Sequence, residues 1–345
     1  MATALQTMTN ELTHVFLLSV GAFLLAMFLT PIYTFFAYRY RFWKHQRENA
    51  VTGEKLQVFN RLHEGKIRRN IPTMAGVISV IAAGLVTLLF NLDRAQTWLP
   101  LAAFAGGAAV GLIDDYLNIF GSNKKDAGMR APVKFALITL IGLVLGWFFY
   151  VKLGVMSFHV PFMGDVSIGW LIIPLFAFAA VATGNAVNIS DGLDGLAGGL
   201  LGISFGAFGV IALLQQQVLL AGFCFTMVGV LLSYLWFNIY PARFFMGDVG
   251  SFAYGVSLGV VAMLTNSLLL LPVIGLLFVI EAGSSLIQIV SKKLFKRKIF
   301  LSAPIHHHLE ASGWPETKVT MRFWVIGCVM AFIGVMLALA GGHIA

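Results

Sequence analysis

The feature that most constrains the fold is a series of long apolar segments that runs through the whole chain. Most of them have the length, about 17–25 residues, with which an α-helix crosses the hydrocarbon core of a bilayer. Only 11% of the 345 residues are charged, whereas soluble domains have about 25%. We therefore predict an all-α polytopic membrane protein with about ten transmembrane helices, in a single transmembrane domain over residues 1–345. The predicted segments are 13–38, 73–91, 98–113, 133–151, 168–189, 196–214, 217–237, 249–265, 267–291 and 320–341.

The distribution of Lys and Arg predicts the orientation of these segments. The odd-numbered connections and their edges hold all but two of the 23 basic residues, and only Arg94 and Lys152 fall on the other side. Basic residues gather in the cytoplasmic loops of membrane proteins. We therefore expect the odd connections in the cytoplasm and both termini on the periplasmic, outer side. The same rule accounts for the net charge of +8 without a nucleic-acid partner.

Five aspartates lie at the ends of apolar segments, and all of them fall on the predicted cytoplasmic side. A carboxylate beside hydrocarbon is unfavourable, by about 2.5–3.5 kcal/mol at a helix centre on insertion scales. Five on one face therefore predict one cytoplasmic active site that holds a divalent cation and a charged substrate. These residues are Asp114, Asp115, Asp191, Asp194 and Asp248.

The motif GLIDDY ends the third segment with Asp114 and Asp115. Adjacent positions of a helix point about 100° apart. One carboxylate could therefore face a metal ion or a substrate while the other anchors a neighbouring helix. The alternative is a solvated helix end without a function.

The segment GNAVNISDGLDGL, residues 184–196, repeats polar residues every three positions, at Asn185, Asn188, Asp191 and Asp194. Its glycines permit an irregular backbone and the close approach of a ligand. Irregular backbone at membrane depth is tolerated where it lines a cavity or is buried in protein. A site is therefore indicated, and the alternative is a short polar turn between two spans.

Asp248 lies between Gly247 and Gly250 in the stretch FFMGDVGS, just before an apolar segment. A hard cation such as Mg²⁺ takes oxygen ligands, usually one or two carboxylates together with substrate phosphates. Scattered aspartates therefore predict Mg²⁺ rather than zinc. Asn238 and Phe245 precede Asp248 and could contact the rest of a substrate, although a phenylalanine also packs.

Three consecutive histidines, His306, His307 and His308, lie in the stretch APIHHHLEASGWPE. A zinc site usually spaces its ligands over a turn, so we expect phosphate contact or proton transfer here, with a structural loop as the alternative. Within the ninth segment, Glu281 is expected to take part in interhelical hydrogen bonding, with Gln288 two turns later.

These motifs, taken in order, resemble the phospho-N-acetylmuramoyl-pentapeptide-transferases, a branch of the polyprenyl-phosphate N-acetylhexosamine-1-phosphate transferases. The resemblance runs from PTMAG (72–76) through the three aspartate motifs to PIHHHLEASGWPE and RFW (322–324), nearly the whole chain. The three histidines followed by GWPE point to the muramoyl-pentapeptide branch.

The resemblance implies transfer of phospho-MurNAc-pentapeptide from UDP-MurNAc-pentapeptide to undecaprenyl phosphate. The products would be lipid I and UMP, Mg²⁺ would be required, and the protein would lie in the bilayer of the bacterial inner membrane. Members of the family are commonly dimers, so a homodimer is possible, but no feature of the sequence decides this.

The resemblance also assigns roles to residues. Catalytic roles fall on Asp114, Asp115, Asp248 and His306, with Asp248 as the Mg²⁺ ligand. The substrate-binding set is Arg68, Lys134, Asn188, Asp191, Gly192, Leu193, Asp194, Asn238, Phe245, Gln288, His307 and His308. Two positions depart from the family pattern. Arg68 and Asn118 each stand where the family usually has a lysine, and Asn118 loses the charge.

Three questions remain open from the sequence. A relative that uses UDP-N-acetylglucosamine would carry out the same chemistry on another sugar. An ion-coupled transporter would place its acids near mid-bilayer and show inverted repeats, whereas these acids lie at segment ends and no repeat is obvious. The reaction could proceed by direct attack of the lipid phosphate or through a covalent aspartyl intermediate.

Overall fold

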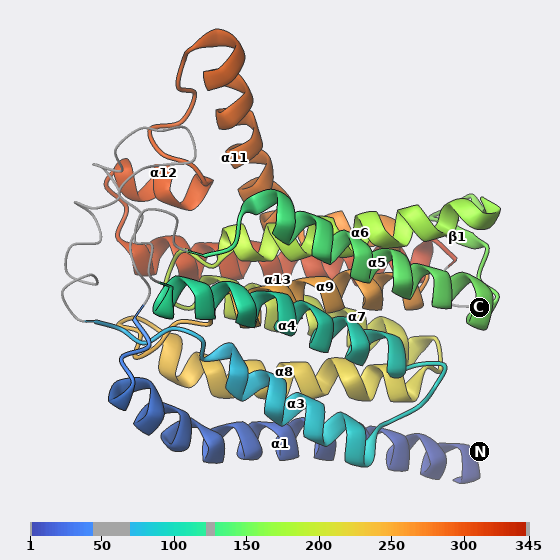
Figure 1. Cartoon of the computed structure of the whole chain (residues 1–345). Coiled ribbons are helices and arrows are strands. Elements are labelled where there is room, and N and C mark those ends of the chain that lie inside the picture. Colours follow the sequence, from blue (N-terminus) through green and yellow to red (C-terminus); the bar gives the residue numbers. More distant parts are fainter. Residues whose placement is uncertain (1, 44–69, 122–127, 343–345) are drawn as a thin grey trace.

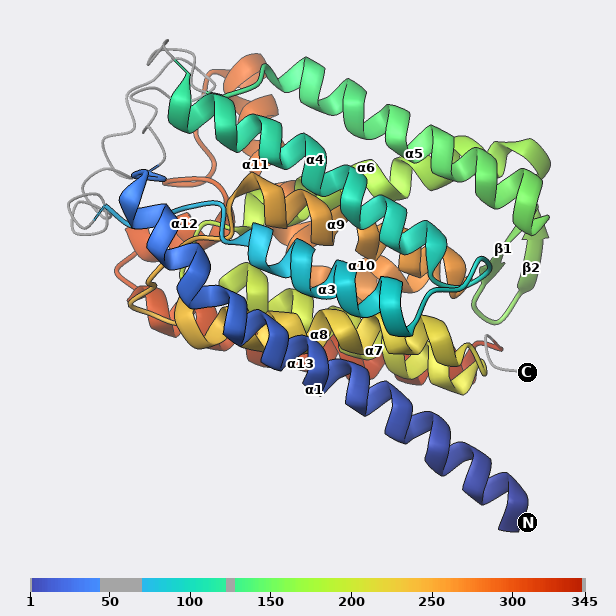
Figure 2. The same cartoon turned by 60° about the horizontal axis from the view of Figure 1, so that its bottom comes forward.

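The computed structural model describes residues 2–43, 70–121 and 128–342. The long helices run side by side as a bundle, with both termini and a small hairpin at one end (Figures 1 and 2). The helices are α1 (Ala2–Arg39), α3 (Gly76–Phe90), α4 (Trp98–Phe120), α5 (Ala131–Leu153), α6 (Ile172–Ser190), α7 (Leu196–Leu214), α8 (Val218–Asn238), α9 (Gly247–Leu264), α10 (Leu271–Ile274), α11 (Leu276–Phe295), α12 (Ile305–Ala311) and α13 (Glu316–Ala340).

Each of the ten predicted segments contains helix, so the prediction of a helical polytopic membrane protein is confirmed. Within the described part of the chain, seven helices are long and apolar enough to cross a membrane, or eight if one bent pair is a single span. Helix α3 is apolar but, with 15 residues, is shorter than these seven helices. Helix α4 is not among the seven, because Asp114 and Asp115 lower its hydropathy. Both termini lie at the same end of the bundle (Figures 1 and 2).

The predicted end of the third segment was wrong. Helix α4 continues beyond residue 113 to Phe120, so Asp114 and Asp115 lie within the helix. Hydropathy placed the end at the first carboxylates. Tertiary contacts keep the next turn helical, since Asp114, Asp115, Asn118 and Ile119 are all buried.

The ninth predicted segment is bent rather than straight. Residues Leu268–Ile274 and Leu276–Phe295 meet at an angle of 81°. Pro272 begins the short helix α10 and Gly275 ends it, and proline and glycine are common causes of such breaks. Helix α11 therefore leaves the direction of the bundle and projects to one side (Figure 1).

The all-α prediction missed a β-hairpin. Strands β1 (Ser157–Val160) and β2 (Gly164–Ser167) pair antiparallel near the C-terminal end of α13. Phe162 and Gly164 have positive φ in the connecting turn. His159 of β1 ties the hairpin to the end of α13, because Nε2 of its ring lies 2.8 Å from the carbonyl oxygen of Gly341.

Glycines bring α4 and α9 into direct backbone contact. A Cβ atom added at Gly111 would lie 2.1 Å from the carbonyl oxygen of Asp248, and one at Gly107 would lie 2.5 Å from that of Phe252. Small residues spaced four apart allow such close packing of membrane helices. The contact places the last turns of α4, with Asp114 and Asp115, against the first turn of α9, with Asp248.

Candidate active site

Three carboxylates from two helices converge where α4 meets α9. Ligand oxygens of Asp114, Asp115 and Asp248 all lie within 4.8 Å of one another. The three residues are buried, with exposed fractions of 3%, 0% and 7% respectively. The sequence predicted that distant aspartates would meet in one site, and the structure brings these three together.

Lys134, in the first turn of α5, bridges two of these carboxylates. Its Nζ lies 2.8 Å from Oδ2 of Asp114 and 2.6 Å from Oδ2 of Asp248. One ammonium group faces three carboxylates, so the cluster keeps an excess of negative charge when all are ionised. Buried like charges are unfavourable unless protons or a cation neutralise them.

Backbone groups fix the orientation of the two adjacent aspartates. The N–H of Met129 donates to Oδ1 of Asp114 at 2.6 Å, and the N–H of Val249 donates to Oδ2 of Asp115 at 3.0 Å. Val249 lies in the first turn of α9, where N–H groups lack partners within the helix. Asp115 therefore anchors a neighbouring helix, as we expected of one member of the pair.

Asp248 depends on the glycine before it. Gly247 has φ +75°, and a Cβ there would lie 2.5 Å from Oδ2 of Asp115. A side chain at this position would strain the backbone and push Asp115 away. Gly247 therefore permits α9 to begin directly against the α4 carboxylates.

The cluster fits a hard divalent cation. Carboxylate oxygens are the ligands that Mg²⁺ prefers, and these three come from two rigid helices. We predicted one metal ligand, Asp248, and the structure offers Asp114 and Asp115 beside it. Within the described residues, this is the one group of three or more His, Cys, Asp or Glu side chains with such spacing. The histidines do not form one.

The predicted polar segment, which spans the last turns of α6 and the residues that follow, lies next to this cluster. Asn188 donates from Nδ2 to Oγ of Ser251 at 2.8 Å, and Ser251 is three residues after Asp248 in α9. Asp191 follows the last residue of α6 and is half-buried. Asn188 thus joins the α6 end of the site to the α9 end.

Asp194 and Asn238 hold the loops around the site. Oδ2 of Asp194 accepts the N–H of Ala242 at 2.9 Å. Asn238 accepts the N–H of Gly195 at 2.9 Å and donates to the carbonyl of Phe244 at 2.8 Å. Both side chains are directed at backbone groups, so they shape the wall of the site between residues 194 and 244.

His306 lies against Gly192, in the loop after α6, and is fully buried. Its Nδ1 lies 2.7 Å from Oε2 of Glu281, which is also fully buried. A Cβ atom at Gly192 would lie 2.3 Å from Nε2 of His306, so ring and backbone are in contact. The predicted interhelical hydrogen bonding of Glu281 is confirmed, and its partner is His306 on α12, whereas Gln288 bonds to the loop at residues 299–300.

The other two histidines have different surroundings. Nδ1 of His307 lies 2.8 Å from Oε2 of Glu310. Burial, followed by the nearby His306, lowers the pKa of His307 to about 4, although Glu310 opposes this. Its ring is therefore neutral at pH 7. His308 instead accepts the N–H of Leu301 at 3.1 Å.

The remaining predicted residues lie further from the carboxylates or cannot be placed. Gln288 accepts the N–H groups of Ile299 and Phe300 and donates to the latter's carbonyl, so it supports the loop before α12. Leu193 is buried in the apolar core. Phe245 is half-buried, and its backbone pairs with Pro72 and Ala75. Arg68 lies outside the described residues.

Two glutamates of the site were not predicted. Glu310 faces His307, and Oε1 of Glu316 accepts the N–H of Asp194 at 2.7 Å. Glu310 follows His307 by three residues, a spacing that places both on one side of a helix. That spacing was the available signal for Glu310, whereas the contact of Glu316 depends on tertiary structure.

Comparison with known proteins gives concordant results. The family model described as glycosyl transferase family 4 matches residues 97–266. Three similar proteins are named phospho-N-acetylmuramoyl-pentapeptide-transferase. That of Chloroflexus aurantiacus is 39% identical, over 97% of this chain and 92% of its own. The protein of Levilactobacillus brevis is 38% identical, over 83% of this chain and 93% of its own length. The protein of Listeria welshimeri is 36% identical, over 91% of this chain and 95% of its own length.

Proposed function

The chain belongs to the phospho-N-acetylmuramoyl-pentapeptide-transferases, and we propose that it transfers phospho-MurNAc-pentapeptide from UDP-MurNAc-pentapeptide to undecaprenyl phosphate. Lipid I and UMP are the products, in a membrane step of peptidoglycan synthesis. We place the reaction at the cytoplasmic face of the bacterial inner membrane, as the distribution of basic residues predicts.

The observation that carries this proposal is the buried cluster of three carboxylates with one lysine. Asp114, Asp115 and Asp248 would hold Mg²⁺, with Asp248 as the principal ligand. The ion would neutralise charge on the diphosphate of the donor and on the departing UMP.

The protein's own groups position the reactants and move one proton. Lys134 lies between Asp114 and Asp248, so its ammonium group stabilises negative charge on the reacting phosphates. A carboxylate of the Asp pair accepts the proton of the acceptor phosphate. An oxygen of that phosphate then bonds to the sugar-linked phosphorus of the donor, and the bond to UMP breaks. In the covalent alternative, an aspartate attacks this phosphorus first.

The donor is expected to contact the loops that surround the cluster. Asn188, Asp191 and Gly192 come from the end of α6, and Phe245 precedes α9. His306 contacts Gly192 and is held by Glu281. We assign His306 to proton transfer and His307, which is neutral at pH 7, to hydrogen bonding with the donor.

The acceptor lipid is expected to approach along α11. This helix leaves the bundle at the 81° bend and exposes a run of large apolar residues. Its C-terminal end leads to α12 and the histidines. The exposed set comprises Val279, Ile280, Leu286, Ile287, Ile289, Val290, Leu294 and Phe295.

A purified-protein assay tests the function. Release of UMP is measured with UDP-MurNAc-pentapeptide and undecaprenyl phosphate, with and without Mg²⁺, and with UDP-N-acetylglucosamine as a competing donor. We expect release that needs Mg²⁺ and the muramoyl donor. Release of UMP from UDP-N-acetylglucosamine instead would assign the protein to the related branch that uses that donor. Release of UMP without the acceptor would favour the covalent route.

A further inference from the structure

A cavity lies at the end of the bundle opposite the carboxylates. Its volume is ≈ 800 Å³, and it opens between the start of α4 and the end of α5. Trp98, the first residue of α4, lies 16 residues before Asp114, which corresponds to about 24 Å along a helix. The cavity is therefore separate from the active site.

The cavity is lined by the two basic residues that lie outside the predicted cytoplasmic connections. Arg94 and Lys152 both line it, and they are the two basic residues that the positive-inside pattern does not explain. They come from positions 58 residues apart. Neither side chain has a hydrogen bond or an ion pair with any other residue that the structure describes. Their charges are thus available to a ligand.

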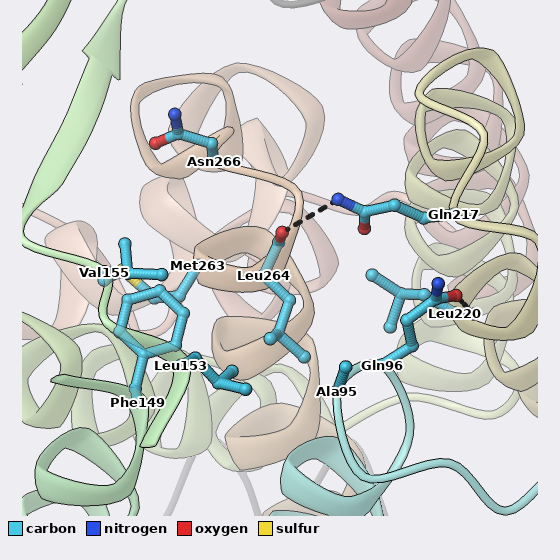
Figure 3. Close-up of a pocket in the computed structure, with 10 residues that line it drawn as sticks. All are labelled: Ala95, Gln96, Phe149, Leu153, Val155, Gln217, Leu220, Met263, Leu264 and Asn266. Atoms are coloured by element: carbon cyan, nitrogen blue, oxygen red, sulfur yellow. Dashed lines mark hydrogen bonds between the residues drawn. The ribbon is translucent and has the colours of Figure 1, made fainter. Parts of the chain in front are cut away.

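The loop that carries Arg94 is held firmly in place. Oδ1 of Asp93 accepts the N–H groups of Ala95 and Gln96, at 2.8 and 2.9 Å. Oε1 of Gln96 accepts the N–H groups that begin α8, those of Leu219 and Leu220. Figure 3 shows Gln96 beside Leu220 in a neighbouring cavity of ≈ 330 Å³. Asp93 also lines the larger cavity and leaves it with one net positive charge.

The rest of the lining is apolar. Trp98, Leu99, Phe148 and Leu153 surround the two cations, and Trp98 is 48% exposed. A lysine at a helix C-terminus and a tryptophan at a membrane interface each have a general explanation. Neither explanation accounts for two unpaired cations that meet in one apolar cavity.

We propose that this cavity binds the phosphate headgroup of an anionic membrane lipid, with Arg94 and Lys152 on the phosphate and Trp98 and Phe148 against the hydrocarbon. The guanidinium group suits bidentate contact with phosphate oxygens. A small anion from solution would gain nothing from the aromatic walls. An uncharged lipid would gain nothing from the cations. The occupant comes from the leaflet at that end of the bundle, the outer leaflet in the predicted orientation.

Native mass spectrometry of the delipidated full chain tests the proposal. Phosphatidylglycerol is titrated against the wild type, the double variant R94Q/K152Q and the charge-preserving variant R94K/K152R. Each surface cation contributes about fivefold to binding an anionic lipid. We expect the first lipid to bind roughly 30-fold or more weakly to the Gln variant and nearly normally to the Lys/Arg variant. Equal affinity of the wild type and the Gln variant would overturn the proposal.

Two further arms identify the ligand and the place. Phosphatidylcholine should bind clearly more weakly than phosphatidylglycerol, and inorganic phosphate should not displace the lipid. Equal binding of both lipids, or displacement by phosphate, would contradict a site for anionic lipid. Brominated phosphatidylglycerol should quench a fluorescence component that W98F lacks, and quenching unchanged in W98F would place the lipid elsewhere. UMP release should be the same in all variants.

Discussion

Nδ1 of His306 lies 2.7 Å from Oε2 of Glu281, and both side chains are fully buried. A carboxyl group in this position fixes the orientation and the tautomer of the ring. The pair joins α11 to α12. Because Nε2 of the ring contacts Gly192, Glu281 acts on the site through the histidine.

Glu281→Gln should therefore lower kcat by roughly 100-fold, the lower end of what proton transfer contributes, with little change in KM. The amide keeps the shape of the side chain and can still hydrogen-bond to the ring, but it cannot exchange a proton with it. Asp165→Asn is the matched control, since Asp165 faces His159 at 2.8 Å in the hairpin at the other end of the bundle. UMP release and thermal unfolding are measured for both variants. A normal kcat in Glu281→Gln would show that Glu281 does not act on the site through His306.

Asn118→Lys should keep or raise activity. Asn118 is buried on α4, four residues after Asp114 and three after Asp115, so a lysine there projects from the same side of the helix. Its ammonium group would add a positive charge beside the phosphates. Asn118→Met, which adds length without charge, is the control for size. A collapse of UMP release in the lysine variant alone would mean that this chain arranges its phosphate contacts differently.

Gly111→Ala should destabilise the protein and reduce turnover. The added Cβ would lie 2.1 Å from the carbonyl oxygen of Asp248, so α4 and α9 must separate. Overpacking of this kind costs about 1–3 kcal/mol. Gly84→Ala in α3 has no atom within 4 Å of the new Cβ and should be tolerated. Equal unfolding temperatures for the two variants would show that the close contact is not needed.

The buried His307 predicts that the protein loses stability in acid. Its pKa is about 4 in the folded protein, against about 6.5 in an unfolded chain. The unfolded state therefore binds a proton first as the pH falls. The stabilisation is complete above pH 6.5 and is lost as the pH falls towards 4, by on the order of 3 kcal/mol. Unfolding of the wild type and His307→Gln is measured between pH 7 and 4. The same pH slope in both would contradict the assignment.

The helices and the convergence of the aspartates could be predicted because both depend on the cost of polar groups in hydrocarbon. That cost places Asp114 and Asp248 at one end of the bundle without knowledge of which helices touch. The glycine contacts at positions 107 and 111, which set the distance between the carboxylates, depend on which helices pack together and could not be read from hydropathy.

Other features depended on tertiary contacts that a linear pattern does not contain. The bend at Gly275 lies within a continuous apolar segment, so hydropathy predicted one straight span. The hairpin at 157–167 is too short for a clear alternating pattern. Interhelical hydrogen bonding of Glu281 could be expected from a carboxyl group inside an apolar segment, but the identity of its partner, His306, depends on the fold.

Binding of one metal ion by the three carboxylates is the central claim, and electron paramagnetic resonance of Mn²⁺ tests it most directly. Mn²⁺ shares the preference of Mg²⁺ for oxygen ligands. We expect one Mn²⁺ per chain, and binding at least about 10-fold weaker in each of Asp114→Asn, Asp115→Asn and Asp248→Asn. Asp165→Asn should bind Mn²⁺ as the wild type does. Unchanged Mn²⁺ affinity in the three cluster variants would contradict the account.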